Sequence, residues 1–271
     1  MIKLIFFLIL SVPVYNLIAE IELSNLPWVN GSTTQSAYYA APYLPNNPVI
    51  LEAGTFDGTD TNRFKKIWDN SMIYGFEPNP ISYKKTLQNI QGINNVQIFP
   101  FALSNYVGWS TFYVSRANFG ASSLYRDNFK DAAKSMPHIF DQIQENHYKD
   151  YPIRVHVTTI DIWAKENHIP YIDYIWLDAE GAELGILKGA TEYLKNVRAI
   201  SIEVNFKEFR VGMAQFENVY EFLVGQGFKL KYIWGSTDVQ SDAIFVNQRF
   251  ESEKLNTSVP FLIPEAINKI S

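Results

Sequence analysis

The sequence contains no cysteine and no block of lysine and arginine among its 271 residues. Without cysteine the chain has no disulfides, no thiolate nucleophile and no cysteine-ligated metal, so redox chemistry does not indicate its compartment. A net charge of -5 with no basic block argues against a nucleic-acid partner. Hydrophobic residues make up 47% of the chain, which is enough for a sizeable core. We therefore expect one domain that binds no nucleic acid.

Three familiar motifs are also missing. The four histidines show no i, i+4 pairing and no metal-ligand spacing, so they do not indicate a metal centre. No G-x-S-x-G elbow follows a strand-like segment, which disfavours a Ser-His-Asp hydrolase. The G-x-G-x-x-G fingerprint is absent as well, and this makes NAD the poorer choice of cofactor.

The most informative stretch, residues 49–58, reads Val-Ile-Leu-Glu-Ala-Gly-Thr-Phe-Asp-Gly. The apolar run predicts a buried strand, and the capping side chains between Asp57 and Thr61 predict that a helix follows the glycine turn. Glycine lets a ligand approach the backbone, and the N–H groups of a helix N-terminus face such a ligand. The turn is therefore typical of a ligand cradle, although a plain strand-to-helix turn would show the same pattern.

A second strand is predicted at residues 72–76, and it ends at Glu77-Pro78 because the residue before proline favours extended geometry. Asn79 is placed to cap the next helix, which runs to about residue 89. Glu77 lies 23 positions after Gly54. An acid near this interval holds the ribose in dinucleotide-type folds. The alternative for Glu77 is a solvated glutamate at the end of a strand.

The middle of the chain predicts further strands at residues 96–99, 109–114 and 155–158. Between them, residues 115–152 are loop-rich and hold scattered aromatic side chains. A long irregular stretch inside a compact domain is typical of a lid or a binding insertion, and a decorated surface excursion is the alternative.

The second informative stretch is the apolar strand predicted at residues 171–177, which runs into Asp178-Ala-Glu180-Gly-Ala-Glu183. The carboxyl ends of strands are where α/β sheets hold their chemistry, so Asp178 and Glu180 are candidate catalytic residues that form an acid/base pair. They could instead be a metal pair, but no Asp/Asn run continues as a calcium loop requires. A third interpretation is that Asp178 caps the next helix while Glu180 and Glu183 complement its dipole.

The remaining pattern predicts a strand at 198–204, a helix at 215–225 and a closing hairpin of 228–233 with 243–246. We expect four regions along the chain. They are a signal-like or anchor segment at 1–19, an irregular lead-in at 20–47, the domain at 48–248 with its insertion at 115–152, and a tail at 249–271.

The N-terminal segment carries one positive charge before a short apolar run, which is too short and interrupted to span a bilayer. It predicts a secretory signal or an uncleaved anchor. We accordingly expect membrane association or the secretory route, and a cytoplasmic protein if the segment is not a signal.

Seven blocks of this chain carry a family resemblance. They are Glu52–Gly58, Phe76–Pro80, Ala102–Ser104, Ala121–Leu124, Thr159–Asp161, Asp178–Glu183 with Leu187–Ala190, and Ile202–Asn205. In this order they resemble the blocks of the FkbM family of S-adenosylmethionine-dependent methyltransferases, over about residues 48–248. The chain departs from the family at Trp176, where a lysine is common, and at Phe56, where an Asn is frequent.

The resemblance implies an α/β fold of the class I methyltransferase (Rossmann-like) type. This fold has a seven-stranded, mostly parallel sheet with helices on both faces and an antiparallel last strand. The implied reaction is methyl transfer to a hydroxyl oxygen, with a sugar, glycan or polyol-like small molecule as the expected acceptor. The alternative is a non-catalytic methyltransferase-like module that recognises a glycan or a protein.

The implied cofactor is S-adenosylmethionine, and no metal is expected. The turn from Gly54 to Gly58 would cradle its amino-acid end, Glu77 would hold the ribose, and Ala102 with Leu103 would flank the adenine. The full set of expected cofactor-binding residues is Glu52, Gly54, Phe56, Asp57, Gly58, Glu77, Asn79, Ala102, Leu103 and Asp178.

Overall fold

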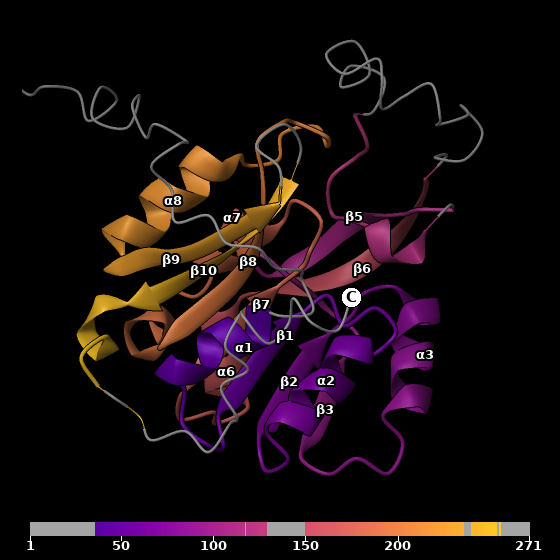
Figure 1. Ribbon diagram of the computed structural model, residues 1–271. Helices are drawn as coiled ribbons and strands as arrows, with labels where there is room; N and C mark the ends of the chain where they lie inside the picture. Colours follow the sequence, from indigo (N-terminus) through magenta and orange to yellow (C-terminus); the bar gives the residue numbers. More distant parts are fainter. Residues whose placement is uncertain (1–35, 117, 129–149, 236–239, 254, 256–271) are drawn as a thin grey trace, which may run out of the picture.

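The computed structural model of the protein describes residues 36–116, 118–128, 150–235, 240–253 and 255 (Figure 1). Its main sheet has seven strands in the order β3-β2-β1-β7-β8-β10-β9. The strands of this sheet are β1 (Val49–Ala53), β2 (Met72–Phe76), β3 (Val96–Phe99), β7 (Tyr174–Leu177), β8 (Ala199–Asn205), β9 (Phe228–Gly235) and β10 (Gln240–Asn247). Neighbouring strands from β3 to β8 are parallel, whereas β10 is antiparallel to both β8 and β9.

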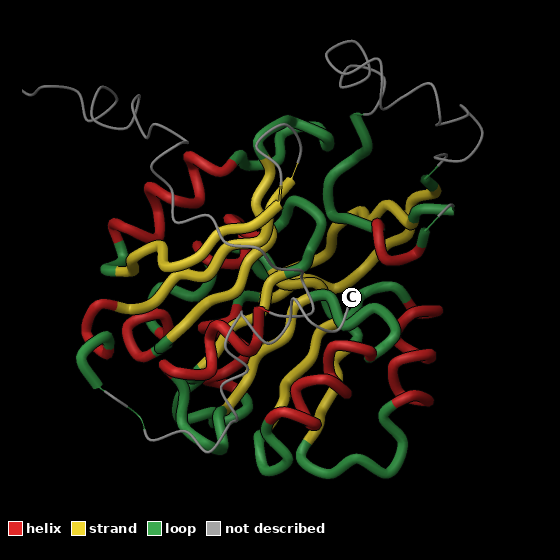
Figure 2. The backbone as a smooth tube through the Cα atoms, in the orientation of Figure 1, coloured by secondary structure: helices red, strands yellow, loops and turns green. Residues whose placement is uncertain are grey.

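Helices flank both faces of this sheet (Figure 2). The helices that carry the argument are α1 (Ser36–Ala40), α2 (Thr59–Ile67), α3 (Pro80–Asn89), α6 (Ile160–Glu166), α7 (Glu183–Lys188) and α8 (Phe216–Gly225). Residues of α1 and α2 pack in one core cluster, and residues of α6, α7 and α8 pack in another on the opposite face. This architecture confirms the expected class I methyltransferase fold.

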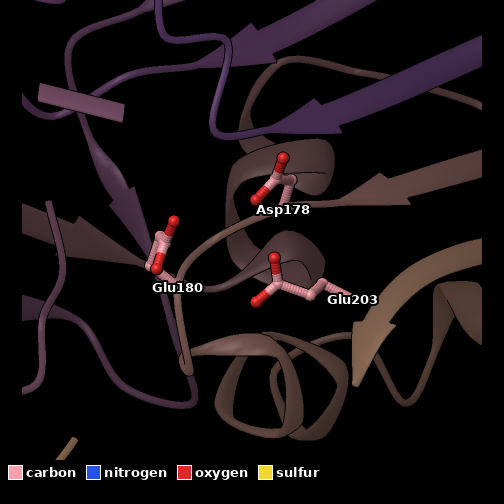
Figure 3. A group of neighbouring side chains, drawn as sticks. All are labelled: Asp178, Glu180 and Glu203. Atoms are coloured by element: carbon pink, nitrogen blue, oxygen red, sulfur yellow. The ribbon is translucent and has the colours of Figure 1, made fainter. Parts of the chain in front are cut away.

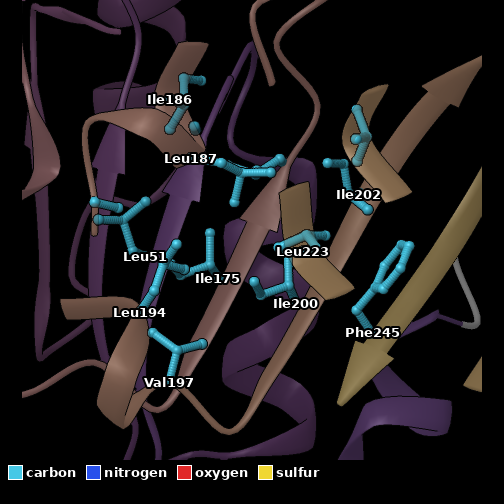
Figure 4. Close-up of a cluster of buried hydrophobic side chains, with 14 of the residues drawn as sticks. Leu51, Ile175, Ile186, Leu187, Leu194, Val197, Ile200, Ile202, Leu223 and Phe245 are labelled. Carbon is cyan, nitrogen blue, oxygen red and sulfur yellow. The ribbon is translucent and has the colours of Figure 1, made fainter. Parts of the chain in front are cut away.

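The central strand β1 shows why the sequence folds this way. Side chains alternate along a strand, so Ile50 faces the α1 and α2 side while Leu51 faces the other. On that second side Leu51 lies near Ile175 of β7 and Leu187 of α7 (Figure 4). A parallel strand covered on both faces must be apolar at consecutive positions, and the run Val-Ile-Leu meets that requirement.

A second, three-stranded sheet stands beside the main one, in the order β4-β6-β5. It consists of β4 (Ala102–Leu103), β5 (Gly108–Val114) and β6 (Tyr151–Thr158). β4 pairs in parallel with β6, and β5 pairs with β6 in the antiparallel sense. The sequence predicted strands at 109–114 and 155–158 but did not indicate a separate sheet. Of the insertion predicted at 115–152, residues 117 and 129–149 lie outside the described residues.

The structure corrects part of the expected lead-in at 20–47. Residues 36–43 form α1 and the 3-10 turn η4 (Ala41–Tyr43), and Ala37 and Ala40 are completely buried. Their small side chains pack in the same cluster as Ile244 of β10. A single helical turn is too short to show a hydrophobic period, so the pattern was not recognisable in the sequence.

The signal-like or anchor segment at 1–19 lies outside the described residues and stays a prediction, as do the region boundaries. Among the helices of the described residues, none is both long enough and apolar enough to cross a bilayer.

Candidate functional site

A cavity of about 260 Å³ opens at the carboxyl ends of β1, β2 and β7. Most of the residues expected from the sequence lie in its wall. These are Gly54, Phe56, Asp57, Glu77, Ala102, Leu103, Asp178 and Glu180. Glu52, Gly58 and Asn79 stand behind this wall and contact the residues that form it or their neighbours. The structure therefore brings the expected residues together at one edge of the sheet.

Gly54 is required for a reason that the sequence did not reveal. It has a φ of +90°, and a Cβ at this position would lie 1.9 Å from the carbonyl oxygen of Asp178. At Gly58, with a φ of +80°, a Cβ would lie 3.2 Å from Cγ2 of Thr86 in α3. We expected these glycines to make room for a ligand. That expectation stays a prediction, and Gly54 does lie in the cavity wall. In addition, Gly54 allows the close approach of β1 to the turn after β7, and Gly58 allows the start of α2 to pack against side chains of α3.

Phe56 occupies the left-handed region with a φ of +49°. This conformation is uncommon for a bulky side chain and persists only where the surroundings impose it. Two contacts do so here, because the Phe56 N–H donates to Oε2 of Glu77 at 2.8 Å and its carbonyl accepts from the Thr86 hydroxyl at 2.8 Å. The turn is thereby fixed to the end of β2 and to α3.

Both carboxylate oxygens of Glu77 accept hydrogen bonds from backbone N–H groups. Its Oε2 accepts from the Phe56 N–H, and its Oε1 accepts from the Asn79 N–H, each at 2.8 Å. Glu77 is only 6% exposed. Burial raises the pKa of Glu77 to about 7, and the two N–H groups oppose that rise. Asn79, as expected, caps α3 by accepting from the Ile81 N–H at 3.0 Å. Each Glu77 oxygen keeps a lone pair for a further donor.

Glu52 is a completely buried carboxyl group at the end of β1. Its Oε2 accepts from the Thr61 hydroxyl at 2.6 Å, and its Oε1 has no hydrogen-bond partner within the described part of the chain. Burial raises the pKa of Glu52 to about 8, although the Thr61 hydrogen bond opposes this rise. A buried oxygen without a partner is costly, so it is a feature that needs an explanation.

The apolar part of the cavity wall comes from the second sheet. Ala102 and Leu103 form β4, which is aligned by its pairing with Val157 and Thr158 of β6. Phe101 lies beside them in the wall. The position of these two expected residues thus depends on a strand more than fifty positions later in the sequence.

The acidic turn after β7 is closed by Glu183. Its Oε1 accepts from the N–H groups of Ala179 at 2.9 Å and Gly181 at 3.2 Å. The N-cap position of α7 is Ala182, and no side chain caps the helix there. The interpretation of Asp178 as a helix cap is therefore wrong. The carboxyl groups of Asp178 and Glu180 are left on the cavity side of the turn.

A third carboxyl group joins these two. Asp178, Glu180 and Glu203 of β8 each place one carboxylate oxygen within 4.8 Å of the others (Figure 3). Burial raises the pKa of Asp178 well above its usual range, and the nearby Glu180 raises it further. Burial also raises the pKa of Glu203, and Asp178 adds to that rise. Asp178 and Glu203 together therefore hold a proton more strongly than an isolated acid does.

Sequence reasoning assigned no role to Glu203 or to Arg210. The sequence signal for Glu203 was an acid near the carboxyl end of a mostly apolar strand. In the structure it lies one residue beyond Ile202, which pairs with Leu177. Arg210 gave no local signal. It forms an ion pair with Glu180, with Nη2 and Oε2 2.8 Å apart.

Comparison with known proteins gives one family. Residues 52–230 match the family whose sequence model is described as the methyltransferase FkbM domain. The 2-O-methyltransferase NoeI of Sinorhizobium fredii is 27% identical over 179 residues, which cover 65% of this chain and 71% of NoeI. Methyltransferase 1 of Beauveria bassiana is 27% identical over 160 residues, which cover 56% of this chain and 61% of that protein.

Solved structures show a more distant similarity. The crystal structure of methyltransferase FkbM from Methylobacillus flagellatus KT aligns with a TM-score of 0.49 at 12% identity. The alignment covers 77% of this chain and 47% of that one, so this chain spans about half the length of that protein.

Proposed function

This chain belongs to the FkbM family of methyltransferases, and on that premise we propose that it transfers a methyl group from S-adenosylmethionine to a hydroxyl oxygen of a sugar, glycan or similar polyol. The observation that carries the proposal is the cavity wall, which joins the buried Glu77 to the carboxyl groups of Asp178 and Glu180. The name of the relative NoeI, a 2-O-methyltransferase, supports oxygen as the acceptor atom.

The residues of the cavity fit S-adenosylmethionine. A carboxylate held by two backbone N–H groups, as in Glu77, suits the two vicinal hydroxyls of a ribose. Ala102 and Leu103 offer an apolar surface for the adenine. Asp57 in the wall supplies negative charge near the glycine turn, which suits the ammonium group at the amino-acid end of the cofactor.

When bound, S-adenosylmethionine supplies an electrophilic methyl group on a positively charged sulfur. The task of the chain is to exclude water, to orient the acceptor hydroxyl and to take up its proton. Asp178 is the base that we favour, because burial gives its carboxyl group a raised pKa and hence a higher affinity for that proton. Glu180 is already engaged by Arg210. Glu203 lies close enough to share the proton with Asp178.

An acceptor screen tests the proposal. Labelled S-adenosylmethionine is offered with monosaccharides, oligosaccharides, polyols and, as a contrasting class, amines. Label transferred to hydroxyl-bearing acceptors supports the proposal, and transfer to amines alone contradicts it. Calorimetry with S-adenosylmethionine is run in parallel. Binding of the cofactor without transfer to any acceptor would favour the non-catalytic module.

Asp178→Asn tests the assignment of the base. We expect turnover to fall by about two to four orders of magnitude, the usual size of an acid/base contribution, while S-adenosylhomocysteine still binds. Glu166→Gln is the matched control, because this exposed acid ends α6 away from the cavity. Near wild-type turnover in Asp178→Asn would exclude Asp178 as the base, and the chain would then promote the reaction by positioning the acceptor and the cofactor. Turnover that requires an added divalent cation would instead assign the three carboxyl groups to metal binding.

A further inference from the structure

Arg210 connects two parts of the site that are far apart in the sequence. It follows β8, is only 4% exposed, and places its Nη2 between two acceptors. Nη2 donates to Oε2 of Glu180 at 2.8 Å and to the carbonyl oxygen of Ala121 at 2.5 Å. Glu180 belongs to the acidic turn after β7, whereas Ala121 ends the 3-10 turn η5 (Phe119–Ala121) that follows β5. One guanidinium group thus holds the acidic turn against the segment that follows β5.

Backbone contacts reinforce this connection. The Val211 N–H donates to the Arg126 carbonyl at 2.8 Å, and the Asn128 N–H donates to the Phe209 carbonyl at 2.8 Å. Residues 126–128 and 209–211 therefore run side by side, with an antiparallel bridge between Asp127 and Arg210. The Ser123 hydroxyl also donates to the Glu180 carbonyl at 2.7 Å.

This junction forms one wall of the cavity. Asn118, Phe119, Gly120, Ser122 and Leu124 line the cavity from the segment that follows β5, and Asp178, Ala179 and Glu180 line it from the acidic turn. The side chain of Arg210 lies behind both groups, since its contacts are with Ala121 and Glu180. A displacement of Arg210 would therefore move the two sides of the wall relative to each other.

The charges around Arg210 make its position costly to change. Arg210 sits beside Glu180. Burial raises the pKa of nearby Asp150, which the charge of Arg210 lowers and that of Glu180 raises further. The Oδ2 atom of Asp150 is buried without a hydrogen-bond partner in the described structure. Removing one member of a buried ion pair leaves the other charge uncompensated. The planar guanidinium group can hold two acceptors in a fixed geometry, whereas the ammonium group of lysine acts as a single point charge.

We propose that Arg210 is a positioning residue for methyl transfer, which fixes Glu180 in the wall and leaves Asp178 facing the acceptor hydroxyl. The proposal rests on the proposed function, and it assigns Arg210 to the acceptor side of the cavity. Glu77, Ala102 and Leu103, which we assign to the cofactor, have no hydrogen bond or ion pair to Arg210 among the contacts of the described residues. Loss of Arg210 should accordingly reduce turnover much more than cofactor affinity.

The first test compares Arg210→Met and Arg210→Lys in the full-length protein, with S-adenosylhomocysteine as the binding probe. In Arg210→Met we expect the dissociation constant to change less than about threefold and turnover to fall about 100-fold or more, as for the loss of a preorganised charged group. Arg210→Lys should recover about tenfold of that loss, because it restores the charge on Glu180 but not the second contact. Equal losses of affinity and turnover in both variants would show a general structural role and overturn the proposal.

The second test asks whether Arg210 acts through Glu180. The double variant Arg210→Met with Glu180→Gln removes both charges, so it leaves no unpaired member of the ion pair and keeps the test valid if the single variant folds poorly. If the proposal is right, the double variant turns over no more slowly than Glu180→Gln alone, since Arg210 acts through Glu180. Multiplicative losses in the double variant would overturn it.

Hydrogen exchange separates this inference from the proposed function, because it needs no acceptor. With S-adenosylhomocysteine bound, the backbone amides of residues 119–128 and 178–183 should exchange faster in Arg210→Met than in the wild type. The exchange rates in β2 should not change. Unchanged exchange in both segments would overturn the linking role even if the enzyme transfers methyl groups. Faster exchange in a protein that methylates no acceptor would support the link while contradicting the proposed function.

Discussion

Replacing Glu52 by glutamine should make the stability of the protein less sensitive to alkaline pH. The side chain of Glu52 is completely buried, and Thr61 is its single hydrogen-bond partner in the described structure. Burial disfavours the charged form of this group, which is why its pKa rises from 4.5 to about 8. Glutamine has nearly the same shape, can still accept from Thr61, and stays neutral at every pH.

The sign follows from proton linkage. Between pH 4.5 and 8 the folded state holds a proton on Glu52 that the unfolded state has lost, so stability falls as pH rises through this window. Above that window the loss is complete. At about 1.36 kcal/mol for each pKa unit, the rise from 4.5 to about 8 sets an upper limit near 5 kcal/mol for the loss. Relaxation and water entry lower this limit, so we expect Glu52→Gln to be about 2 to 4 kcal/mol more stable than wild type at pH 9.

Urea unfolding of the cofactor-free protein at pH 5, 7 and 9 measures this difference. At pH 5 the two proteins should agree within about 1 kcal/mol, because Glu52 is then neutral in the folded state. The exposed control Glu166→Gln should follow the wild-type curve at every pH. Thr61→Val should enlarge the total loss and extend it to higher pH, since it removes the hydroxyl that favours the charged form. If the free energies of unfolding of the wild type and Glu52→Gln changed in parallel with pH, the reasoning would be refuted, because ionisation of Glu52 would then cost no stability.

Two further substitutions address the turn and the ribose contact. Gly54→Ala should lower the free energy of unfolding by about 3 kcal/mol or more, because its Cβ would overlap the Asp178 carbonyl, and this is checked by urea unfolding. In the same assay Gly225→Ala, in α8 with open space around it, should be neutral or stabilise by about 1 kcal/mol. Glu77→Ala should weaken S-adenosylmethionine binding by about 1 to 3 kcal/mol in calorimetry, and an unchanged affinity would remove the ribose role. Because the pKa of Glu77 is about 7, wild-type binding should strengthen from pH 6 to pH 8 as its carboxylate ionises, and Glu77→Gln should lose this dependence.

The side of the site that we assign to the cofactor could be predicted from the sequence because the patterns that define it are local. The run at 49–51 had to be a strand covered on both faces, and Gly54 and Glu77 follow two strands whose carboxyl ends meet at one edge. Asn79 could be recognised as a cap from its place before Pro80.

Other elements could not be recognised from a local pattern. The two residues of β4 are too few to show a period, and their alignment depends on pairing with β6 about 50 positions later. The helix α1 is a single turn that packs against β8 and β10, and its Tyr39 ring contacts the rings of Tyr232 and Trp234 in β9. Isolated helices this short do not persist in water, so tertiary packing decides their existence.

The sequence by itself determined the order of the strands of the main sheet and of the longer helices, and the edge of the sheet at which the candidate site lies, since apolar periodicity and turn residues act over a few neighbouring positions. The family followed from the resemblance of seven short sequence blocks. Only the tertiary structure decided that Glu203 joins Asp178 and Glu180, and that Arg210 holds Glu180 against Ala121. Arg210 and Ala121 are 89 positions apart. Contacts between single side chains over such distances leave no repeating pattern in the chain, because they depend on how the strands and loops are placed in space.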